Sequence, residues 1–112
     1  MEEFIRKIED LGWSVVEFDD GLAISQYSPA GEDFLFEIST RTSITKAIQE
    51  IEEYVENFDE DDHVEMWVEA KYHGNGNREA IPSIKELVYD AEAIHNMLRE
   101  LADYLNKEYK EV

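Results

Sequence analysis

Three histidines, His63, His73 and His95, are the first candidates for metal binding or catalysis. No two of them lie three or four positions apart, and the sequence contains no HExxH or HxxxH motif, so a zinc site would need Asp or Glu ligands brought together in space. His63 with Glu65 or Glu69 is the combination nearest in sequence. We favour the simpler interpretation, in which His63 is a surface residue of an acidic helix.

An acidic run at residues 59–62 (DEDD) suggests a calcium loop at first sight. An EF-hand loop needs glycine at its sixth position and glutamate at its twelfth. Counted from Asp59, those positions hold Val64 and Ala70. Acidic residues before and within the first turn of a helix stabilise the helix dipole. We therefore interpret the run as a helix start, and we expect no metal ion and no cofactor.

Motifs for nucleophilic catalysis and phosphate binding do not occur in the sequence. There is no cysteine and no GxSxG elbow. The glycine-rich stretch at 74–77 (GNGN) lacks the lysine of a phosphate loop, and we interpret it as a connection. Paired carboxylates occur throughout a chain with 28 acidic residues, so they single out no acid–base pair. We expect a protein that is not an enzyme.

The distribution of charge is the most informative feature of the sequence. The chain has 28 acidic and 10 basic residues, a formal net charge of −18, and residues 47–70 contain no Lys or Arg. A solvated helix face ordinarily mixes both signs, whereas acids one turn apart repel by about 0.2–0.5 kcal/mol per pair. A domain that tolerates this repulsion can use the negative field. The residues predicted to bind a partner are Glu52, Glu56, Asp59, Asp61, Asp62, Glu65 and Glu69.

Such acids can imitate a row of nucleic-acid phosphates. Neighbours one helical turn apart lie about 5–6 Å from one another, and double-stranded DNA carries one charge per about 1.7 Å of its axis. A surface of this kind must be exposed, and its acids must be largely free of Lys and Arg partners. The alternative, that the charge serves only solubility or adaptation to salt, stays open at this point.

Length and composition indicate one soluble domain over residues 1–112. The chain is 43% hydrophobic and 12% aromatic, and a domain of this size buries roughly two thirds of its unfolded surface. The N-terminus lacks the basic start and apolar run of a signal peptide. No apolar stretch approaches the roughly 20 residues that span a bilayer. The absence of cysteine fits a reducing compartment, so we expect a cytoplasmic protein.

The hydrophobic pattern predicts a sheet in the first half of the chain. Residues 2–11 carry apolar side chains at helical spacing. Residues 13–18, 22–27 and 33–39 are short strand-like segments separated by DDG and SPAG turns. They predict a three-stranded antiparallel meander after an N-terminal helix.

The second half of the chain is predicted to be helical. Helical spacing runs from the candidate N-cap Ser43 to residue 58, and a shorter helix is expected at 61–73. A long helix at 84–106 follows a capping-box signature of Ser83 and Glu86. The predicted fold is α+β, with the three later helices packed on one face of the sheet. The residues expected in the core are Trp13, Phe34, Phe36, Ile51, Trp67, Leu87, Ile94, Leu98 and Leu101.

Four stretches resemble a group of small acidic proteins, largely uncharacterised, that phages and mobile elements of gut Firmicutes encode. They lie at 27–34 (YSPAGEDF), 65–71 (EMWVEAK), 82–88 (PSIKELV) and 90–94 (DAEAI). This resemblance implies a mobile-element origin and supplies no active site. The element order is also similar to that of some type II-A anti-CRISPR proteins, whose acidic faces occupy the DNA-binding groove of the effector nuclease. That likeness is architectural only, with no shared motif.

We therefore expect a non-enzymatic phage or mobile-element inhibitor that mimics nucleic-acid charge and occupies a basic nucleic-acid-binding site on a partner protein. The candidate partners are an effector nuclease, a restriction enzyme or a mobile-element protein. Direct binding to nucleic acid or to an anionic membrane is disfavoured by repulsion.

Two alternatives from other classes stay open. One is an accessory or scaffold module that binds through apolar surface, including a homodimer along the last helix. The other is a small carboxylate or metal-dependent enzyme. Electrostatic binding weakens steeply as salt rises, whereas apolar association does not, so salt separates the inhibitor from the scaffold module.

Overall fold

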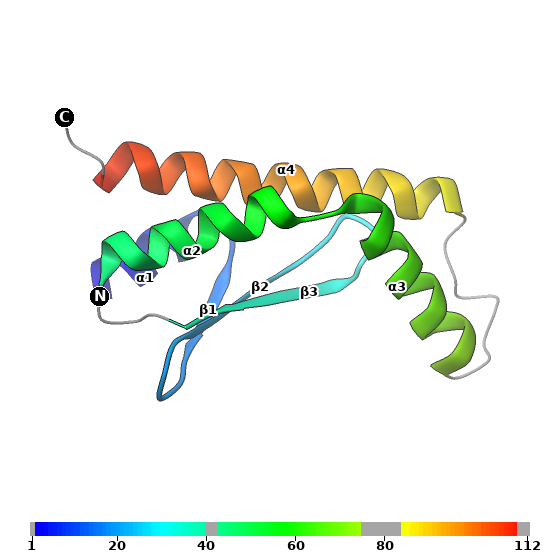
Figure 1. The fold of residues 1–112 in the computed structure, drawn as a ribbon, viewed down its shortest axis with the longest axis horizontal. Coiled ribbons are helices and arrows are strands. Elements are labelled where there is room, and N and C mark those ends of the chain that lie inside the picture. The colour runs from blue at the N-terminus through cyan, green and yellow to red at the C-terminus, as the bar shows by residue number, and fades with distance from the viewer. Residues whose placement is uncertain (1, 40–42, 75–83, 110–112) are drawn as a thin grey trace.

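The computed structural model describes residues 2–39, 43–74 and 84–109, the side chains of 70–74 and 84 excepted. Every predicted element is present in that part of the chain, within three residues of its expected bounds, and the α+β class is confirmed (Figure 1). The elements in order are α1 (Glu2–Asp10), β1 (Ser14–Glu17), β2 (Leu22–Tyr27), β3 (Asp33–Ile38), α2 (Ile44–Asn57), α3 (Glu60–Gly74) and α4 (Ile84–Tyr109).

Helix α1 ends where Gly12 takes a positive φ. Gly12 has φ +97°, and its N–H donates to the carbonyl of Glu9 at 2.9 Å. A Cβ at this position would lie 2.6 Å from the side-chain amide of Gln26, so both conformation and space favour glycine. Phe4 and Ile8 of α1 are fully buried and face the core. After Gly12 the chain continues into β1. α1 packs against β1 and α4.

Strands β1, β2 and β3 form the predicted antiparallel meander in that order. The β1–β2 turn is closed by the N–H of Phe18, which donates to the carbonyl of Gly21 at 3.0 Å. Gly21 also lies against the backbone of Ile38 so closely that a Cβ would clash with its carbonyl oxygen. This glycine therefore lets the start of β2 meet the end of β3.

The two faces of the sheet differ in burial. Phe34 and Phe36 on β3 are buried, whereas Leu35 between them is 52% exposed. Val16 on β1 and Tyr27 on β2 are likewise exposed. This alternation directs one face toward the helices and leaves the other open to solvent, as a strand period of two requires. Figure 1 shows α2 and α4 lying over the covered face.

The starts of α2 and α4 were both predicted from capping residues. At α2 the predicted N-cap is confirmed, because the Ser43 hydroxyl accepts a hydrogen bond from the N–H of Lys46 at 3.3 Å. The capping box of α4 cannot be described, since Ser83 lies outside the described residues. With 26 residues, α4 is about 39 Å long at 1.5 Å per residue. It runs the length of the molecule and packs against α1, α2 and α3 (Figure 1).

The core lies between the covered face of the sheet and the helices. All nine residues predicted to be buried are buried, and Ile51, Ile94, Leu98 and Leu101 are fully enclosed. Trp67 and Leu87 are buried outside the main core cluster, on the two helices that meet as α3 packs on α4. None of the described helices combines the length and apolar content needed to cross a membrane.

Candidate functional site

The joint between α2 and α3 places the acidic run at a defined point of the surface. Phe58 leaves the helical conformation, with φ −69° and ψ 117°, and its N–H still donates to the carbonyl of Val55 at 3.3 Å. Asp59 then caps α3, because its Oδ1 accepts from the N–H groups of Asp61 at 2.9 Å and Asp62 at 3.2 Å. The interpretation of the run as a helix start is confirmed, and Asp59 is its N-cap.

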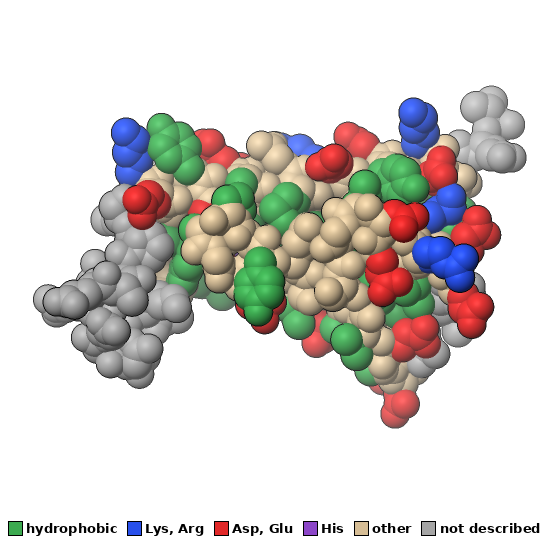
Figure 2. Space-filling view, turned by 180° about the vertical axis from the view of Figure 1, so that it is seen from behind, with side chains coloured by type: hydrophobic (Ala, Val, Ile, Leu, Met, Phe, Trp, Pro, Cys, Tyr) green, Lys and Arg blue, Asp and Glu red, His purple; other side chains and the backbone are tan. Residues whose placement is uncertain are grey.

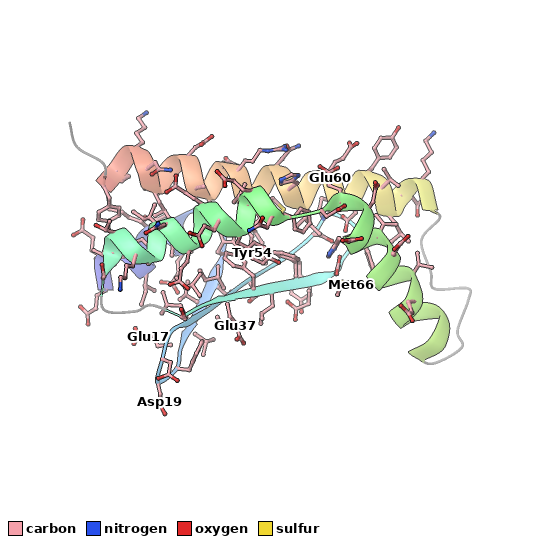
Figure 3. All side chains as sticks on the ribbon, in the orientation of Figure 1. Glu17, Asp19, Glu37, Tyr54, Glu60 and Met66 are labelled. Atoms are coloured by element: carbon pink, nitrogen blue, oxygen red, sulfur yellow. The ribbon has the colours of Figure 1, made fainter. Side chains whose placement is uncertain are left out.

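A cluster of aromatic rings packs between the α2–α3 joint and β3. The ring of Phe58 lies 6.0 Å from that of Phe34 and 6.3 Å from that of Tyr54, between ring centroids. Tyr54 stacks on Phe36 at 4.7 Å. Tyr54 projects from α2, and Met66 from α3, toward β3 (Figure 3). The joint is therefore fixed against the covered face of the sheet by ring contacts.

Two histidine–glutamate contacts hold the start of α3. His63 Nε2 lies 2.9 Å from Oε2 of Glu32, which precedes β3, and His95 Nδ1 on α4 lies 2.7 Å from Oε2 of Glu60. His95 Nε2 also lies 3.2 Å from the carbonyl oxygen of Val55. The side chain of His63 is only 14% exposed, so its interpretation as a surface residue of an acidic helix is wrong. The aromatic cluster and Glu32 enclose it.

His63 and His95 do not share a metal site in the described part of the chain. Among the described residues, no group of three or more His, Asp or Glu side chains is placed to hold a metal ion. His63 contacts Glu32 rather than Glu65 or Glu69, which were its neighbours in sequence. The side chain of His73 lies outside the described part of the chain.

Most of the predicted partner-binding residues face solvent. Glu56, Asp59, Asp61, Asp62, Glu65 and Glu69 are exposed, and so is Glu53, which the sequence pattern did not single out. Within the part of the chain that the structure describes, no salt bridge joins any of these seven to a Lys, Arg or His. We call these seven residues the acidic ribbon: Glu53, Glu56, Asp59, Asp61, Asp62, Glu65 and Glu69.

Glu52 is the exception among the predicted residues. Its side chain is half-buried and its Oε2 accepts a hydrogen bond from Nδ2 of Asn106 on α4 at 3.1 Å. The prediction that Glu52 is exposed is therefore wrong. Position 52 lies on the flank of α2 that meets α4, whereas positions 53 and 56 lie on the solvent side.

The far side of the molecule has a different charge pattern. Figure 2 shows Lys and Arg side chains lying among acidic ones at the end of the molecule where α1 is found. There Lys7 contacts Glu108 at 2.6 Å and Glu3 at 3.9 Å. Among the described residues the acidic ribbon forms no such salt bridge, so its field is not compensated by an ion pair there.

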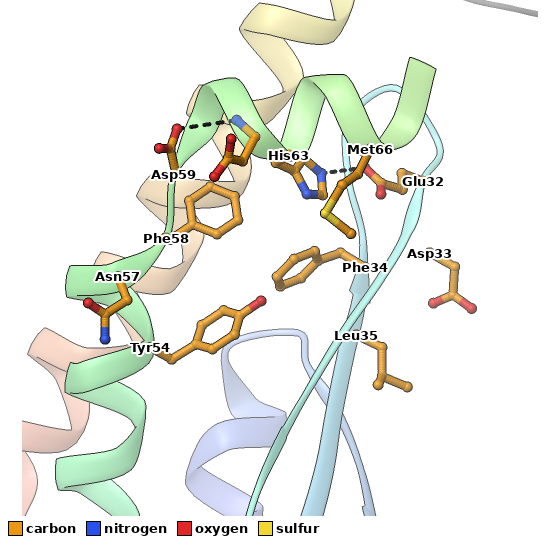
Figure 4. Close-up of a pocket in the computed structure, with 11 residues that line it drawn as sticks. Glu32, Asp33, Phe34, Leu35, Tyr54, Asn57, Phe58, Asp59, His63 and Met66 are labelled. Carbon is orange, nitrogen blue, oxygen red and sulfur yellow. Dashed lines mark hydrogen bonds and ion pairs between the residues drawn. The ribbon is translucent and has the colours of Figure 1, made fainter. Parts of the chain in front are cut away.

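A pocket of about 450 Å³ opens beside the middle of the ribbon, between β3 and the α2–α3 joint (Figure 4). Asp59 and Asp62 belong to both the ribbon and the pocket. The sequence alone did not reveal the pocket, because Glu32 and Asp33 on one side of it come from the other half of the chain. We call it the aromatic pocket; its lining residues are Glu32, Asp33, Phe34, Leu35, Tyr54, Asn57, Phe58, Asp59, Asp62, His63 and Met66.

The hydroxyl of Tyr54 reports on the environment of the aromatic pocket. Burial raises the pKa of Tyr54 above its ordinary value, and the negative charge of Glu32 raises this pKa further. Both causes disfavour a second negative charge at the hydroxyl. The inside of the pocket is thus partly dry and under negative potential.

Comparisons with known proteins identify no matching family model, no matching curated protein and no matching solved structure.

Proposed function

We propose that this protein is a non-enzymatic inhibitor of phage or mobile-element origin that presents its acidic ribbon to a basic nucleic-acid-binding site on a partner protein. The observation that carries the proposal is the outward display of the ribbon without basic partners among the described residues. Exposed like charges on one surface destabilise a fold slightly and contribute nothing to its core. A surface that retains them suits an oppositely charged partner.

The spacing of the ribbon supports mimicry of a phosphate track. Glu65 and Glu69 are one turn apart on α3, as are Asp61 and Glu65, and such neighbours lie about 5–6 Å from one another. One strand of a duplex carries a phosphate per about 3.4 Å of axis, which is a spacing of the same order. The chain changes direction at Phe58, between α2 and α3 (Figure 1). The acids carried by these two helices therefore follow a bent path. Such a path fits a groove that holds curved nucleic acid.

A second candidate function rests on the open face of the sheet. Val16 is 64% exposed and Tyr27 70% exposed there, together with Leu35. Apolar side chains on an exposed sheet face are suited to a scaffold module that binds by burial. Its binding would persist at high salt, whereas binding through the ribbon would weaken steeply.

The test begins with a salt-eluted partner and ends with competition for DNA. Immobilised protein captures its partner from host lysate, and a salt gradient releases it. The isolated partner is then loaded with a labelled duplex, and the protein is titrated in. Wild-type protein is expected to displace the duplex. Replacing Glu53, Glu56, Glu65 and Glu69 together by Lys is expected to abolish displacement, because attraction becomes repulsion.

A matched variant controls for net charge. Glu9, Glu92, Glu100 and Asp103 are exposed acids of α1 and α4 outside the ribbon, and replacing them by Lys changes the charge by the same amount. We expect this variant to displace the duplex nearly as well as wild type. The proposal is wrong if both variants compete equally, or if the partner stays bound at high salt while wild type displaces no DNA.

A further inference from the structure

The aromatic pocket combines rings and carboxylates around one space. Phe34, Tyr54 and Phe58 surround it, with centroid separations of 6.0–6.3 Å among the three rings (Figure 4). Met66, which is 68% exposed, lies over the same space. A volume of about 450 Å³ falls in the range of about 300–1,000 Å³ found for small-ligand pockets, so a long side chain can enter it.

The charge of the aromatic pocket has one sign. Four acidic residues line it, Glu32, Asp33, Asp59 and Asp62, and no Lys or Arg is among the described residues that line it. The imidazole of His63 is already in contact with Glu32. The raised pKa of Tyr54, which Glu32 contributes to, fits the same negative potential. A phosphate or carboxylate group would be repelled from this space.

Aromatic faces next to carboxylates are the surroundings that suit an organic cation. A guanidinium or ammonium group within about 6 Å of a ring centroid is attracted by the ring quadrupole. Guanidinium is planar, stacks on rings and binds carboxylates with two parallel hydrogen bonds, whereas ammonium is a compact and strongly hydrated point charge. A pocket with several rings and several carboxylates favours guanidinium.

We propose that the aromatic pocket is a subsite for an arginine side chain of the basic partner, held between the rings of Tyr54 and Phe58 and the carboxylates of Glu32 and Asp62. That the arginine belongs to the basic partner protein rests on the proposed function, whereas the affinity of the pocket for a guanidinium group does not. The basic partner supplies the cation, because the pocket opens beside Asp59 and Asp62 of the acidic ribbon. The ribbon attracts the partner at long range, and the subsite fixes its register.

The test uses a single arginine derivative as the probe. The chain has three methionines, so selective ¹³C-methyl labelling gives a sparse spectrum in which Met66 reports on the pocket and Met97, packed against the core, serves as internal reference. N-acetylarginine amide is expected to shift the Met66 methyl saturably, with a dissociation constant on the order of 1 mM for a ligand of that size. Nuclear Overhauser contacts should join its δ-methylene to the rings of Tyr54 and Phe58.

Two further probes separate the causes of binding. The citrulline analogue has the same shape without the charge, and it is expected to leave Met66 unshifted. The lysine analogue keeps the charge without the planar fork, and it is expected to bind more weakly. The proposal is overturned if the arginine probe leaves Met66 unmoved, if citrulline binds equally, or if lysine matches arginine.

Variants at the rim complete the test. Glu32→Gln with Asp62→Asn removes two charges that line the pocket while keeping their size, and it is expected to weaken the arginine probe by about 3- to 10-fold. Glu92→Gln with Glu100→Gln removes two exposed charges on α4 and is expected to bind the probe as wild type does. Equal binding by both double variants would contradict the subsite.

The outcome is independent of the duplex-displacement experiment. The four acids reversed there, Glu53, Glu56, Glu65 and Glu69, do not line the aromatic pocket. If wild type displaces no DNA while the arginine probe still shifts Met66, the proposed function fails and the subsite stands. If DNA is displaced while the probe leaves Met66 unmoved, the subsite fails and the proposed function stands.

Discussion

Oε2 of Glu32 lies 2.9 Å from Nε2 of His63, and this contact ties the segment before β3 to the first turns of α3. The residues are 31 positions apart in the chain. Their contact closes one side of the aromatic pocket, since both residues line it. The position of α3, and with it four of the seven residues of the acidic ribbon, therefore depends on a side chain from the segment before β3.

Replacing Glu32 by Ala should loosen the start of α3. A part-buried hydrogen bond contributes about 0.5–1.5 kcal/mol to the free energy of unfolding. We expect a loss of that size, together with faster amide hydrogen exchange over residues 60–69 than in α2. Glu65→Ala, on the exposed side of the same helix, is the control and should change neither quantity appreciably. Unchanged exchange in α3 of the Glu32 variant would contradict the contact.

Asp59 should matter to the fold through its cap and to binding through its charge. Asp59→Ala removes both, and the lost N-cap should cost about 0.5–2 kcal/mol in urea unfolding. Asp59→Asn keeps a capping oxygen and should restore most of that stability. If the two variants are equally unstable, the capping geometry is not what stabilises the start of α3.

Leu98 tests the position of α4 on the core. Its side chain is fully buried near the middle of the helix, so Leu98→Ala should lower the free energy of unfolding by about 2–5 kcal/mol. Leu35→Ala, on the open face of the sheet, loses a leucine of the same size that is half exposed, and it should cost much less. A thermal midpoint unchanged by Leu98→Ala would place this side of α4 on the surface.

The elements could be predicted because their patterns are local. Alternation in residues 33–39 and the period of 3.6 in residues 84–106 each follow from the two environments that one element meets. The break between α2 and α3 was visible in the same way, as the end of one apolar stripe at Phe58 and the start of an acidic run at Asp59. No distant contact was needed for either inference.

The site could be predicted only in part, because it depends on contacts between distant segments. Glu52 belongs to the acidic window by sequence, yet Asn106 on α4 covers its flank of the helix. Glu32 and Asp33 lie outside the window, yet the meander carries them to the start of α3. Neither Asn106 nor Glu32 has a local signal that names its partner, so only the packing of α4 and β3 reveals them.

The Lys7–Glu108 pair should give a pH-dependent contribution to stability. The hydrogen bond from Lys7 lowers the pKa of Glu108 below 4.5, and the same bond to Glu108 raises the pKa of Lys7 above 10.5. A lowered carboxyl pKa stabilises the fold above its unfolded-state value, and this contribution is lost as pH falls through the lowered pKa. Glu108→Gln should therefore reduce the thermal midpoint near neutral pH. The difference from wild type should shrink below about pH 4, and an equal difference at both pH values would contradict the pair.

Tyr54 provides a direct measure of the potential inside the aromatic pocket. Burial is the larger cause of the raised pKa of Tyr54, and the charge of Glu32 is the smaller cause. The ¹³Cζ resonance of Tyr54 should therefore titrate with a pKa above 10.0 and above the pKa of N-acetyltyrosinamide in the same buffer. Because the pKa is higher in the folded state, the stability that the neutral hydroxyl contributes is complete below pH 10.0 and is lost as pH rises through the raised pKa. Glu32→Gln removes the charge and keeps an oxygen for His63, so it should lower the pKa of Tyr54 without returning it to 10.0. Glu65→Gln removes an exposed charge outside the pocket and should leave the titration in place. If Tyr54 titrates identically in wild type and Glu32→Gln while the amide spectrum stays dispersed, the pocket does not hold the negative potential that a cationic side chain needs.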